Sequence, residues 1–275
     1  MHDVRVAVVR TAEWLIKGSP DEAARKLRAA LEGVGLEPEG DGTSFTAQAK
    51  RSLLKNRWAS QIDVAITPAS GDRSLAVVKV DMAGTKHYEM LDELAESMGD
   101  AVDDRGLTEA VERLGRFSRV FGRKEVRHAR HFLHGDEEVL QLGQGKYGDK
   151  MGIIVLTNKR LFFFEKSWAA QTVEEFPLKS ISSVSVESKR TGEKLKIHAS
   201  GNVSEIEQMF HGHGDEVARQ IRGLIAERDA PVAAAAPAAQ PDAIEQIRRL
   251  AELKDAGVLS DEEFAAKKTQ LLNQL

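Results

Sequence analysis

The chain has 275 residues, of which 41% are hydrophobic and 30% are charged, so it is long enough for more than one hydrophobic core. It contains no cysteine, which excludes a disulfide framework, a thiolate metal site and a cysteine nucleophile. No apolar run approaches the roughly 18 residues of a membrane-spanning helix, and the first residues lack a signal-peptide pattern. We therefore expect a cytoplasmic protein of two or three domains.

The first residues fit two secondary structures. The alternation of Val4, Val6 and Val8 favours a strand, whereas Val4, Val8 and Leu15 would share one face of a helix, and we favour the strand. A helix follows, because residues 19–22 read Ser-Pro-Asp-Glu, a capping box with proline at the first helical position. Its apolar stripe continues to Gly33, where we expect the helix to end.

Three further segments of the first 104 residues alternate between apolar and polar side chains, and we expect each to be a strand. They are Phe45 to Ala49, Ile62 to Ile66, and Leu75 to Val80. Helical spacing returns from Lys86 to Met98. Residues 1–104 are therefore predicted to form a small α+β domain with one sheet and two helices.

Residues 105–134 are predicted to form a basic amphipathic helix that connects two domains. The segment 105–135 has a net charge of +5, while the whole chain has −4. Its basic side chains share one helical face, opposite an apolar face. They are Arg105, Arg116, Arg119, Arg123, Arg127, Arg130 and His134. Such a face suits anionic lipid headgroups or nucleic-acid phosphates, but it is also typical of a solvated helix that packs on its neighbour.

Short strands follow each other closely in residues 135–228, and this spacing favours a β-barrel or sandwich. The predicted strands are Val139 to Leu142, Gly152 to Thr157, Arg160 to Lys166, Val173 to Leu178, Ile181 to Glu187, and Leu195 to His198. A helix of good period then begins near Asp215.

Two apolar runs of this module are joined by Thr157-Asn158-Lys159-Arg160, and the sequence around this break resembles the bacterial PH-like domain family. The resemblance covers roughly residues 120–228, and it implies a β-barrel that the last helix closes, with a binding rather than a catalytic role. PH domains that bind phosphoinositides use basic residues in and after their first hairpin loop. Lys146, Lys150, Lys159 and Arg160 occupy similar places, although the second strand lacks a K-x-R pair.

Two other patterns suggest chemistry that we do not expect. The glycines at 143, 145 and 148 match G-x-G-x-x-G, but a strand follows them instead of the helix that a dinucleotide site needs, so we interpret them as a flexible hairpin turn. His128, His131 and His134 are spaced like metal ligands, yet on a helix the outer two diverge by about 120°. We expect these histidines to be structural or exposed to solvent, and we expect no metal and no cofactor.

The last 47 residues divide into a linker and a helical hairpin. Residues 229–241 are an Ala/Pro tract with no material for a core. Residues 242–275 resemble the SHOCT family of short C-terminal helical hairpins, with the anchors of its pattern present in IRRLAELKDAGVLSDEEFAAKKTQLL. Two such helices bury too little surface to be stable alone, so their apolar face should dock on a partner. We expect the docking residues to be Ile244, Ile247, Leu250, Leu253, Phe264, Leu271 and Leu272.

The expected fold class is multidomain α+β: the small domain, a central PH-like barrel with a capping helix, and the C-terminal hairpin. No nucleophile motif appears, and the adjacent glutamate pairs at 137–138 and 174–175 would face opposite sides of a strand. We therefore expect a non-catalytic scaffold that binds a protein or its own copies through residues 242–275. The alternatives are a peripheral protein at the inner membrane face, held by the stripe in residues 105–134, and nucleic-acid binding through the same stripe, which we expect less.

Overall fold

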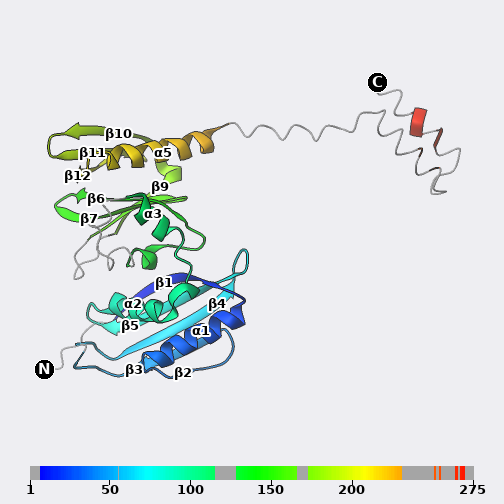
Figure 1. Ribbon diagram of the computed structural model, residues 1–275, viewed down its shortest axis with the longest axis vertical. Coiled ribbons are helices and arrows are strands. Elements are labelled where there is room, and N and C mark those ends of the chain that lie inside the picture. Colours follow the sequence, from blue (N-terminus) through cyan, green and yellow to red (C-terminus); the bar gives the residue numbers. More distant parts are fainter. Residues whose placement is uncertain are drawn as a thin grey trace. The chain divides into compact units, whose positions relative to one another are not determined.

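The computed structural model describes residues 7–54, 56–114, 128–165 and 173–230, and seven residues near the C-terminus: 251, 254, 264, 265 and 267–269. The chain divides into two compact units, Met1–Ile225 and Ala226–Leu275. The first unit contains two antiparallel sheets (Figure 1). None of the described helices is both long and apolar enough to cross a membrane.

The α+β domain is an antiparallel sheet of five strands in the order β1-β5-β4-β3-β2. Helices α1 and α2 cover one face of the sheet (Figure 1). The strand prediction for the first residues is confirmed from Ala7 onward, because β1 pairs with β5 from Ala7↔Ala83 to Lys17↔Arg73. The elements are β1 (Ala7–Lys17), α1 (Pro20–Gly33), β2 (Pro38–Glu39), β3 (Ser44–Ala49), β4 (Ser60–Pro68), β5 (Arg73–Ala83) and α2 (His87–Met98).

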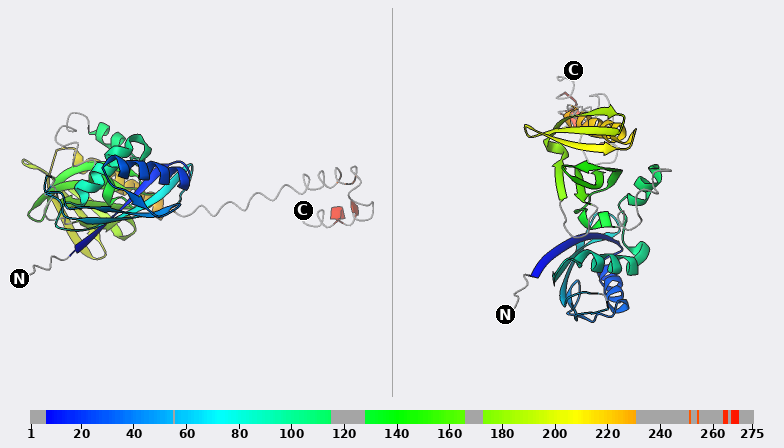
Figure 2. Two further views of the ribbon diagram at one scale, coloured as in Figure 1. Left: turned by 90° about the horizontal axis from the view of Figure 1, so that it is seen from below. Right: turned by 90° about the vertical axis from the view of Figure 1, so that its left-hand side faces the viewer.

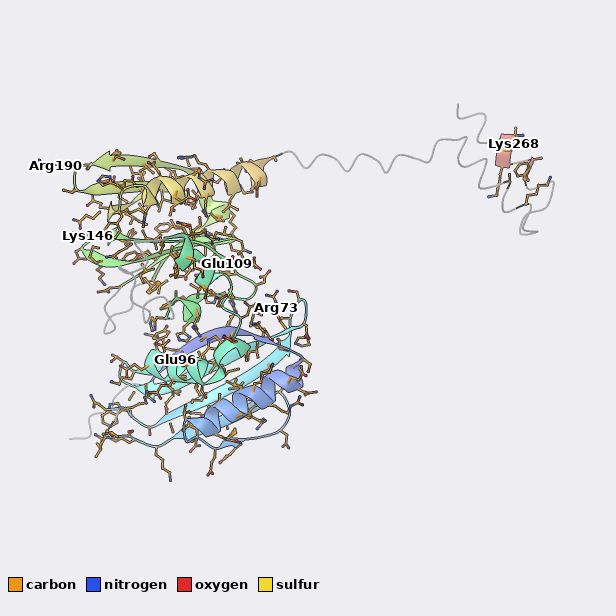
Figure 3. All side chains as sticks on the ribbon, viewed as in Figure 1. Arg73, Glu96, Glu109, Lys146, Arg190 and Lys268 are labelled. Carbon is orange, nitrogen blue, oxygen red and sulfur yellow. The ribbon has the colours of Figure 1, made fainter. Side chains whose placement is uncertain are left out.

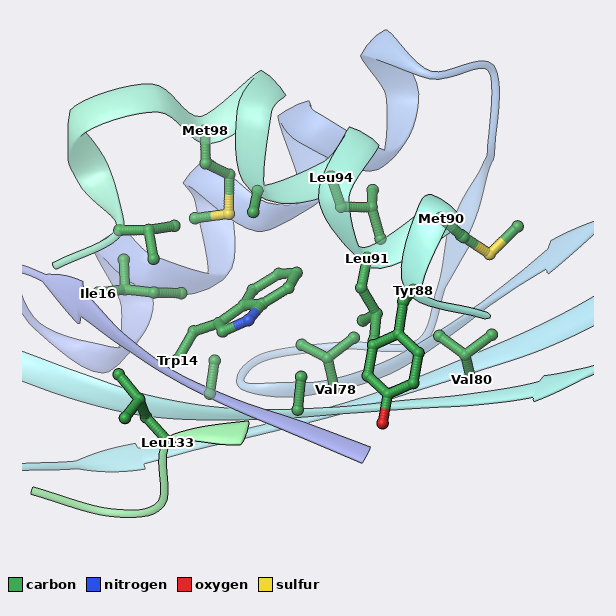
Figure 4. Packing of buried hydrophobic residues seen from close by; sticks show 14 of the residues in the cluster. Trp14, Ile16, Val78, Val80, Tyr88, Met90, Leu91, Leu94, Met98 and Leu133 are labelled. Atoms are coloured by element: carbon green, nitrogen blue, oxygen red, sulfur yellow. The ribbon is translucent and has the colours of Figure 1, made fainter. Parts of the chain in front are cut away.

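The capping box at the start of α1 is formed as the sequence predicts. The Ser19 hydroxyl accepts from the backbone N–H of Glu22, and the Glu22 carboxylate accepts from the backbone N–H of Ser19 at 3.0 Å. These bonds satisfy N–H groups that would otherwise lack partners at the helix start. Between sheet and helices lies an apolar core in which Trp14 and Leu91 are among the largest fully buried side chains (Figure 4).

The described residues do not follow the helix predicted over residues 105–134 throughout, and residues 115–127 of it lie outside the described part. Helix α3 covers only Leu107–Arg113, and a 3₁₀ helix, η3, covers Arg130–Phe132. Arg105 precedes α3 with a φ of 54°, is 4% exposed, and donates to the Glu13 carbonyl at 2.8 Å. A side chain at Gly106 would lie 2.9 Å from the Val139 carbonyl, and the φ of this residue is 80°, which together explain why glycine occupies this position. Arg105 therefore belongs to the core, while Arg116, Arg119, Arg123 and Arg127 lie outside the described residues.

The second module is a sheet of seven antiparallel strands in the order β10-β11-β12-β6-β7-β8-β9. Six of its strands match predicted segments, and the prediction missed the seventh, β12. The elements are β6 (Val139–Tyr147), β7 (Lys150–Thr157), β8 (Arg160–Glu165), β9 (Val173–Pro177), β10 (Ile181–Lys189), β11 (Gly192–Ala199), β12 (Asn202–Met209) and α5 (His213–Asp229). Two short 3₁₀ helices are η1 (Gly99–Ala101), which follows α2, and η4 (Leu178–Ser180), which lies between β9 and β10. Strands from both ends of this sheet share one core with α5, as expected of a sheet that curves around its capping helix.

Strands β7 and β8 are buried on both faces. Ile153 and Phe162 belong to a cluster that continues into the α+β domain, whereas Ile154 and Phe163 belong to the cluster under α5. This explains the uninterrupted apolar runs of the sequence, which are typical of strands covered on both sides. The two modules of the first unit therefore share one hydrophobic core, and Figure 2 shows the two sheets from two further directions.

Candidate functional site

Two histidines of the connecting segment converge on one carboxylate of α2. Asp92 lies 2.8 Å from Nε2 of His131 and 3.5 Å from Nδ1 of His128. The possible ligand atoms of the three side chains all lie within 4.8 Å of one another, a separation that a metal ion could bridge. The sequence did not indicate Asp92, because it lies more than 30 residues before the histidines and on another element.

The hydrogen bonds around His131 argue against a metal ion. The indole Nε1 of Trp14 donates to Nδ1 of His131 at 3.2 Å, so Nδ1 is the unprotonated nitrogen and Nε2 carries the hydrogen that faces Asp92. A histidine that ligates through Nε2 needs a lone pair there and normally donates its Nδ1–H to a neighbour. The arrangement present here is the reverse, and it does not fit a metal ligand.

The protonation states of this cluster follow from burial. The His131 side chain is fully buried, and desolvation lowers its pKa from 6.5 to about 4, so it is neutral near pH 7. Burial alone would raise the pKa of Asp92, but hydrogen bonds from His128 and His131 outweigh it and hold that pKa well below its usual range. Asp92 is therefore the charged member, and the cluster joins β1, α2 and the segment that enters the second sheet. His134, with 57% of its side chain exposed, is not part of it.

The Thr-Asn-Lys-Arg turn between β7 and β8 has a structural explanation. The Thr157 hydroxyl accepts from the backbone N–H groups of Lys159 and Arg160 at 3.1 and 3.0 Å, which fixes the turn. The Arg160 guanidinium is 7% exposed and donates to both carboxylate oxygens of Glu137, at 2.7 and 3.0 Å. It also faces Glu175 at 2.6 Å. This arginine is therefore a buried cross-link of the module.

The structure does not gather the predicted basic residues into one site. Lys146 and Lys150 stand at the β6–β7 end, whereas Lys159 and Arg160 stand at the opposite end of β7, roughly 25 Å away for a strand of this length. Figure 3 labels Lys146 on β6. Lys150 pairs with Glu165 at 3.0 Å, and Lys159 pairs with Asp136. Arg130 is half-buried in η3. A single pocket that would bind a phosphorylated headgroup through all four residues is absent from the described part of the module.

The glycine motif is also structural. Gly143 and Gly145 lie within β6, and only Gly148, with a φ of 60°, occupies the turn before β7. A side chain at Gly145 would lie 2.6 Å from the Ile206 side chain of β12. The interpretation as a turn is thus right for Gly148 but wrong for Gly143 and Gly145, which lie in a strand, and Gly145 makes room for the neighbouring strand β12.

The C-terminal segment is described at seven residues only. Phe264 is half-buried, with the ammonium groups of Lys254 and Lys268 at 5.3 and 6.0 Å from its ring centroid. Both distances suit cation–π attraction. The other predicted docking residues lie outside the described part, as does the linker from residue 231 onward.

Comparison with protein families identifies two segments of the chain. Residues 133–223 match the family described as "Bacterial PH domain", and residues 245–272 match the family described as "Short C-terminal domain", SHOCT. Both resemblances inferred from the sequence are thereby confirmed. The first match runs from the end of η3 into α5, so it covers the whole second sheet. No curated protein matches the chain significantly.

Proposed function

We propose that the protein is a non-catalytic binding protein whose C-terminal SHOCT segment attaches the PH domain and the α+β domain to a partner, foremost to further copies of the same chain. The observation that carries this proposal is the separation of the chain into two units, with the SHOCT match entirely inside the second. The Ala/Pro tract of the sequence stands between the PH and SHOCT matches and has the composition of a linker.

The size of the hairpin supports a docking role. A SHOCT match of 28 residues is too short to bury a core of its own, because chains below about 40 residues rarely fold without a metal, disulfides or a partner. Cysteine is absent from the sequence, so disulfides cannot supply the missing stability. Association through the apolar face remains the route that the composition favours.

The chemistry of the matched PH domain supports binding over catalysis. The buried groups at the β7–β8 turn, Glu137 and Arg160, neutralise one another and are 3% and 7% exposed. They stabilise the fold and offer no reactive side chain to a substrate. A binding protein that is clustered by its C-terminal segment would gain avidity from several weak contacts.

The test is the solution mass of the full chain and of a chain ending at Asp229, measured by light scattering coupled to gel filtration at several concentrations. An oligomer for the full chain and a monomer for the shortened one support the proposal. In the full chain, Leu253→Glu combined with Leu271→Glu should also give a monomer, whereas Lys267→Glu, an exposed position on the same hairpin, should leave the mass unchanged. A monomeric full chain would exclude self-association, and residues 242–275 would then serve as bait for another protein.

A further inference from the structure

The N-terminal half of β1 is a free edge of the five-stranded sheet. Strand β1 is the outermost strand and pairs with β5 on one side. On its other side, the carbonyls of Glu13 and Leu15 accept hydrogen bonds from the Arg105 guanidinium and the Asp103 N–H, both at 2.8 Å. These bonds cover the C-terminal half of the strand. Residues 7–11 form no such bonds to another described segment.

The alternation along β1 shows which backbone groups remain available. In an antiparallel pair, every second residue bonds to the neighbouring strand, and the residues between them face away from it. Glu13 and Leu15 face away from β5, and the pairing with β5 has no register shift, so the backbone groups of Val9 and Thr11 also face away. The Val9 carbonyl accepts a long bond from the Arg10 side chain, at 3.5 Å. The two N–H groups and the Thr11 carbonyl have no hydrogen-bond partner within the described part of the chain.

A cleft of about 430 Å³ lies along this free edge. Its walls include Val9 and Thr11 of β1, the aromatic rings of Tyr88 and Phe132, and Val173 of β9. Strand β9 is itself the outermost strand of the second sheet, so the outer strands of two sheets border the cleft. An extended chain would match the alternating backbone groups of β1 and would place every second side chain against these apolar walls.

Two polar side chains of the cleft are available to a ligand. Tyr88 is 8% exposed, its hydroxyl has no hydrogen-bond partner among the described residues, and Figure 4 shows its oxygen pointing away from α2. Burial raises the pKa of this hydroxyl, and the nearby charge of Arg10 opposes that shift only partly, so the hydroxyl stays protonated and can donate. Arg10 is half-exposed and forms no ion pair with a described carboxylate. Glu175, the carboxylate in the described wall, is held by Arg160 at 2.6 Å. The available donors therefore suit an anionic group.

We propose that the free half of β1 binds an extended segment of a partner protein as an added strand, and that Arg10 and Tyr88 bind an aspartate or glutamate side chain of that segment. Main-chain bonds to β1 supply affinity, and the acidic side chain supplies selectivity. A second copy of the chain is less suitable, because residues 7–12 read Ala-Val-Val-Arg-Thr-Ala and offer no acidic side chain to Arg10. This site rests on the binding role proposed above, but it does not require self-association through residues 242–275.

The test titrates the full-length protein into fluorescein-labelled heptapeptides Thr-Val-Thr-X-Thr-Val-Thr, in which X is Glu or Gln, and follows fluorescence anisotropy. An extended peptide of this pattern turns X and both valines to one side. We expect the Glu peptide to bind at least about tenfold more tightly, because the Gln peptide loses the charge-assisted bonds. Arg10→Gln and Tyr88→Phe should each reduce this preference at least about threefold. The matched controls Arg25→Gln, at an exposed position of α1, and Tyr147→Phe, in the PH domain, should leave it unchanged.

Methylation of the peptide backbone tests the strand pairing. Methyl groups on the nitrogens that face β1 should abolish binding, whereas those at the positions between should have little effect. Equal affinity for the two peptides, no binding of either, or a methylation pattern without alternation would overturn the proposal. No peptide binding together with a lower solution mass for Thr11→Pro would instead assign the edge to a second copy. The full chain with Leu253→Glu and Leu271→Glu should keep the peptide affinity, so this proposal and self-association can fail separately.

Discussion

Trp14 of β1 donates its indole hydrogen bond to Nδ1 of His131 across 3.2 Å, and this bond fixes the tautomer of a fully buried histidine. Nε2 of the same ring then faces Asp92 of α2 at 2.8 Å. The ring thus links the sheet and a helix of the α+β domain to the segment that enters the PH domain. A neutral imidazole is required for this pattern, because protonated Nδ1 could not accept the bond.

Protonation of His131 should destabilise the fold in mildly acidic solution. Its pKa is about 4 when folded and 6.5 for the unperturbed group, so the unfolded chain binds the proton first. The contribution of neutral His131 to the free energy of unfolding is fully present above about pH 6.5, and it decreases as the pH falls toward 4. Between pH 7 and pH 4.5, the wild type should lose on the order of 2 kcal/mol more free energy of unfolding than His131→Gln. Urea titrations at both pH values measure the difference.

The control for this prediction is His134→Gln. That imidazole is 57% exposed, so its removal should leave the pH dependence of the wild type intact. Equal slopes for the wild type and His131→Gln would show that another group causes the acid sensitivity.

Glu137→Gln should strongly destabilise the PH domain. The variant leaves the guanidinium of Arg160 buried with only the partly exposed Glu175 as an anionic partner. Removing one member of a buried ion pair costs about 3–5 kcal/mol, and we expect the lower end of that range. Chemical denaturation measures the loss. Asp136→Asn, which breaks the neighbouring exposed pair with Lys159, should be indistinguishable from the wild type, and comparable losses in the two variants would refute the assignment.

Gly152→Ala should disturb the hairpin of β7 and β8. An added Cβ would lie 2.3 Å from both the Phe163 ring and the Phe164 carbonyl, and the carbonyl belongs to the backbone and cannot rotate away. Overpacking of this kind costs roughly 2 kcal/mol or more. Gly223→Ala on α5 meets no atom within 4 Å and should be neutral or stabilising by up to about 1 kcal/mol. Thermal denaturation of both variants compares the two sites, and a stable Gly152→Ala protein would contradict the packing described.

Glu193→Gln should loosen helix α5. The carboxylate of Glu193, on β11, is 3% exposed and accepts from the backbone N–H groups of Gly212 and Gly214, both at 2.7 Å. A negative charge here also interacts favourably with the helix N-terminus. We expect a loss of about 1–3 kcal/mol and faster hydrogen exchange along α5. Glu187→Gln on β10 removes an exposed carboxylate and should leave the exchange rates of α5 unchanged.

The sequence predicted most elements because their periodicity was regular, as in β3, whose burial alternates at every residue. It missed β12 because only Ile206 and Met209 of that strand are fully buried, and Gln208 interrupts the alternation with a φ of 55°. It placed the start of the connecting helix at residue 105 instead of Leu107, because a helical wheel assumes helical backbone angles and Arg105 has a positive φ.

The roles of single residues were harder to predict than the elements. The sequence places Arg160 where basic residues of phosphoinositide-binding PH domains lie, but its guanidinium is buried against Glu137, which is 23 positions away in the sequence. Asp92 gave no signal at all, because its histidine partners come from a distant segment. The roles of Arg160 and Asp92 both depend on contacts between segments that are far apart in the sequence, and the pattern of residues along one chain does not reveal such contacts.

Because β7 and β8 are buried on both faces, the α+β domain and the PH domain cannot readily be separated, either by truncation or by recombination. If the α+β domain were deleted, one whole face of the hairpin, including Ile153 and Phe162, would meet water and invite aggregation. The two domains should therefore melt in a single cooperative transition, and recombination between them should yield insoluble products unless the new neighbour carries a matching apolar surface. We therefore expect the α+β domain and the PH domain to be retained together during evolution.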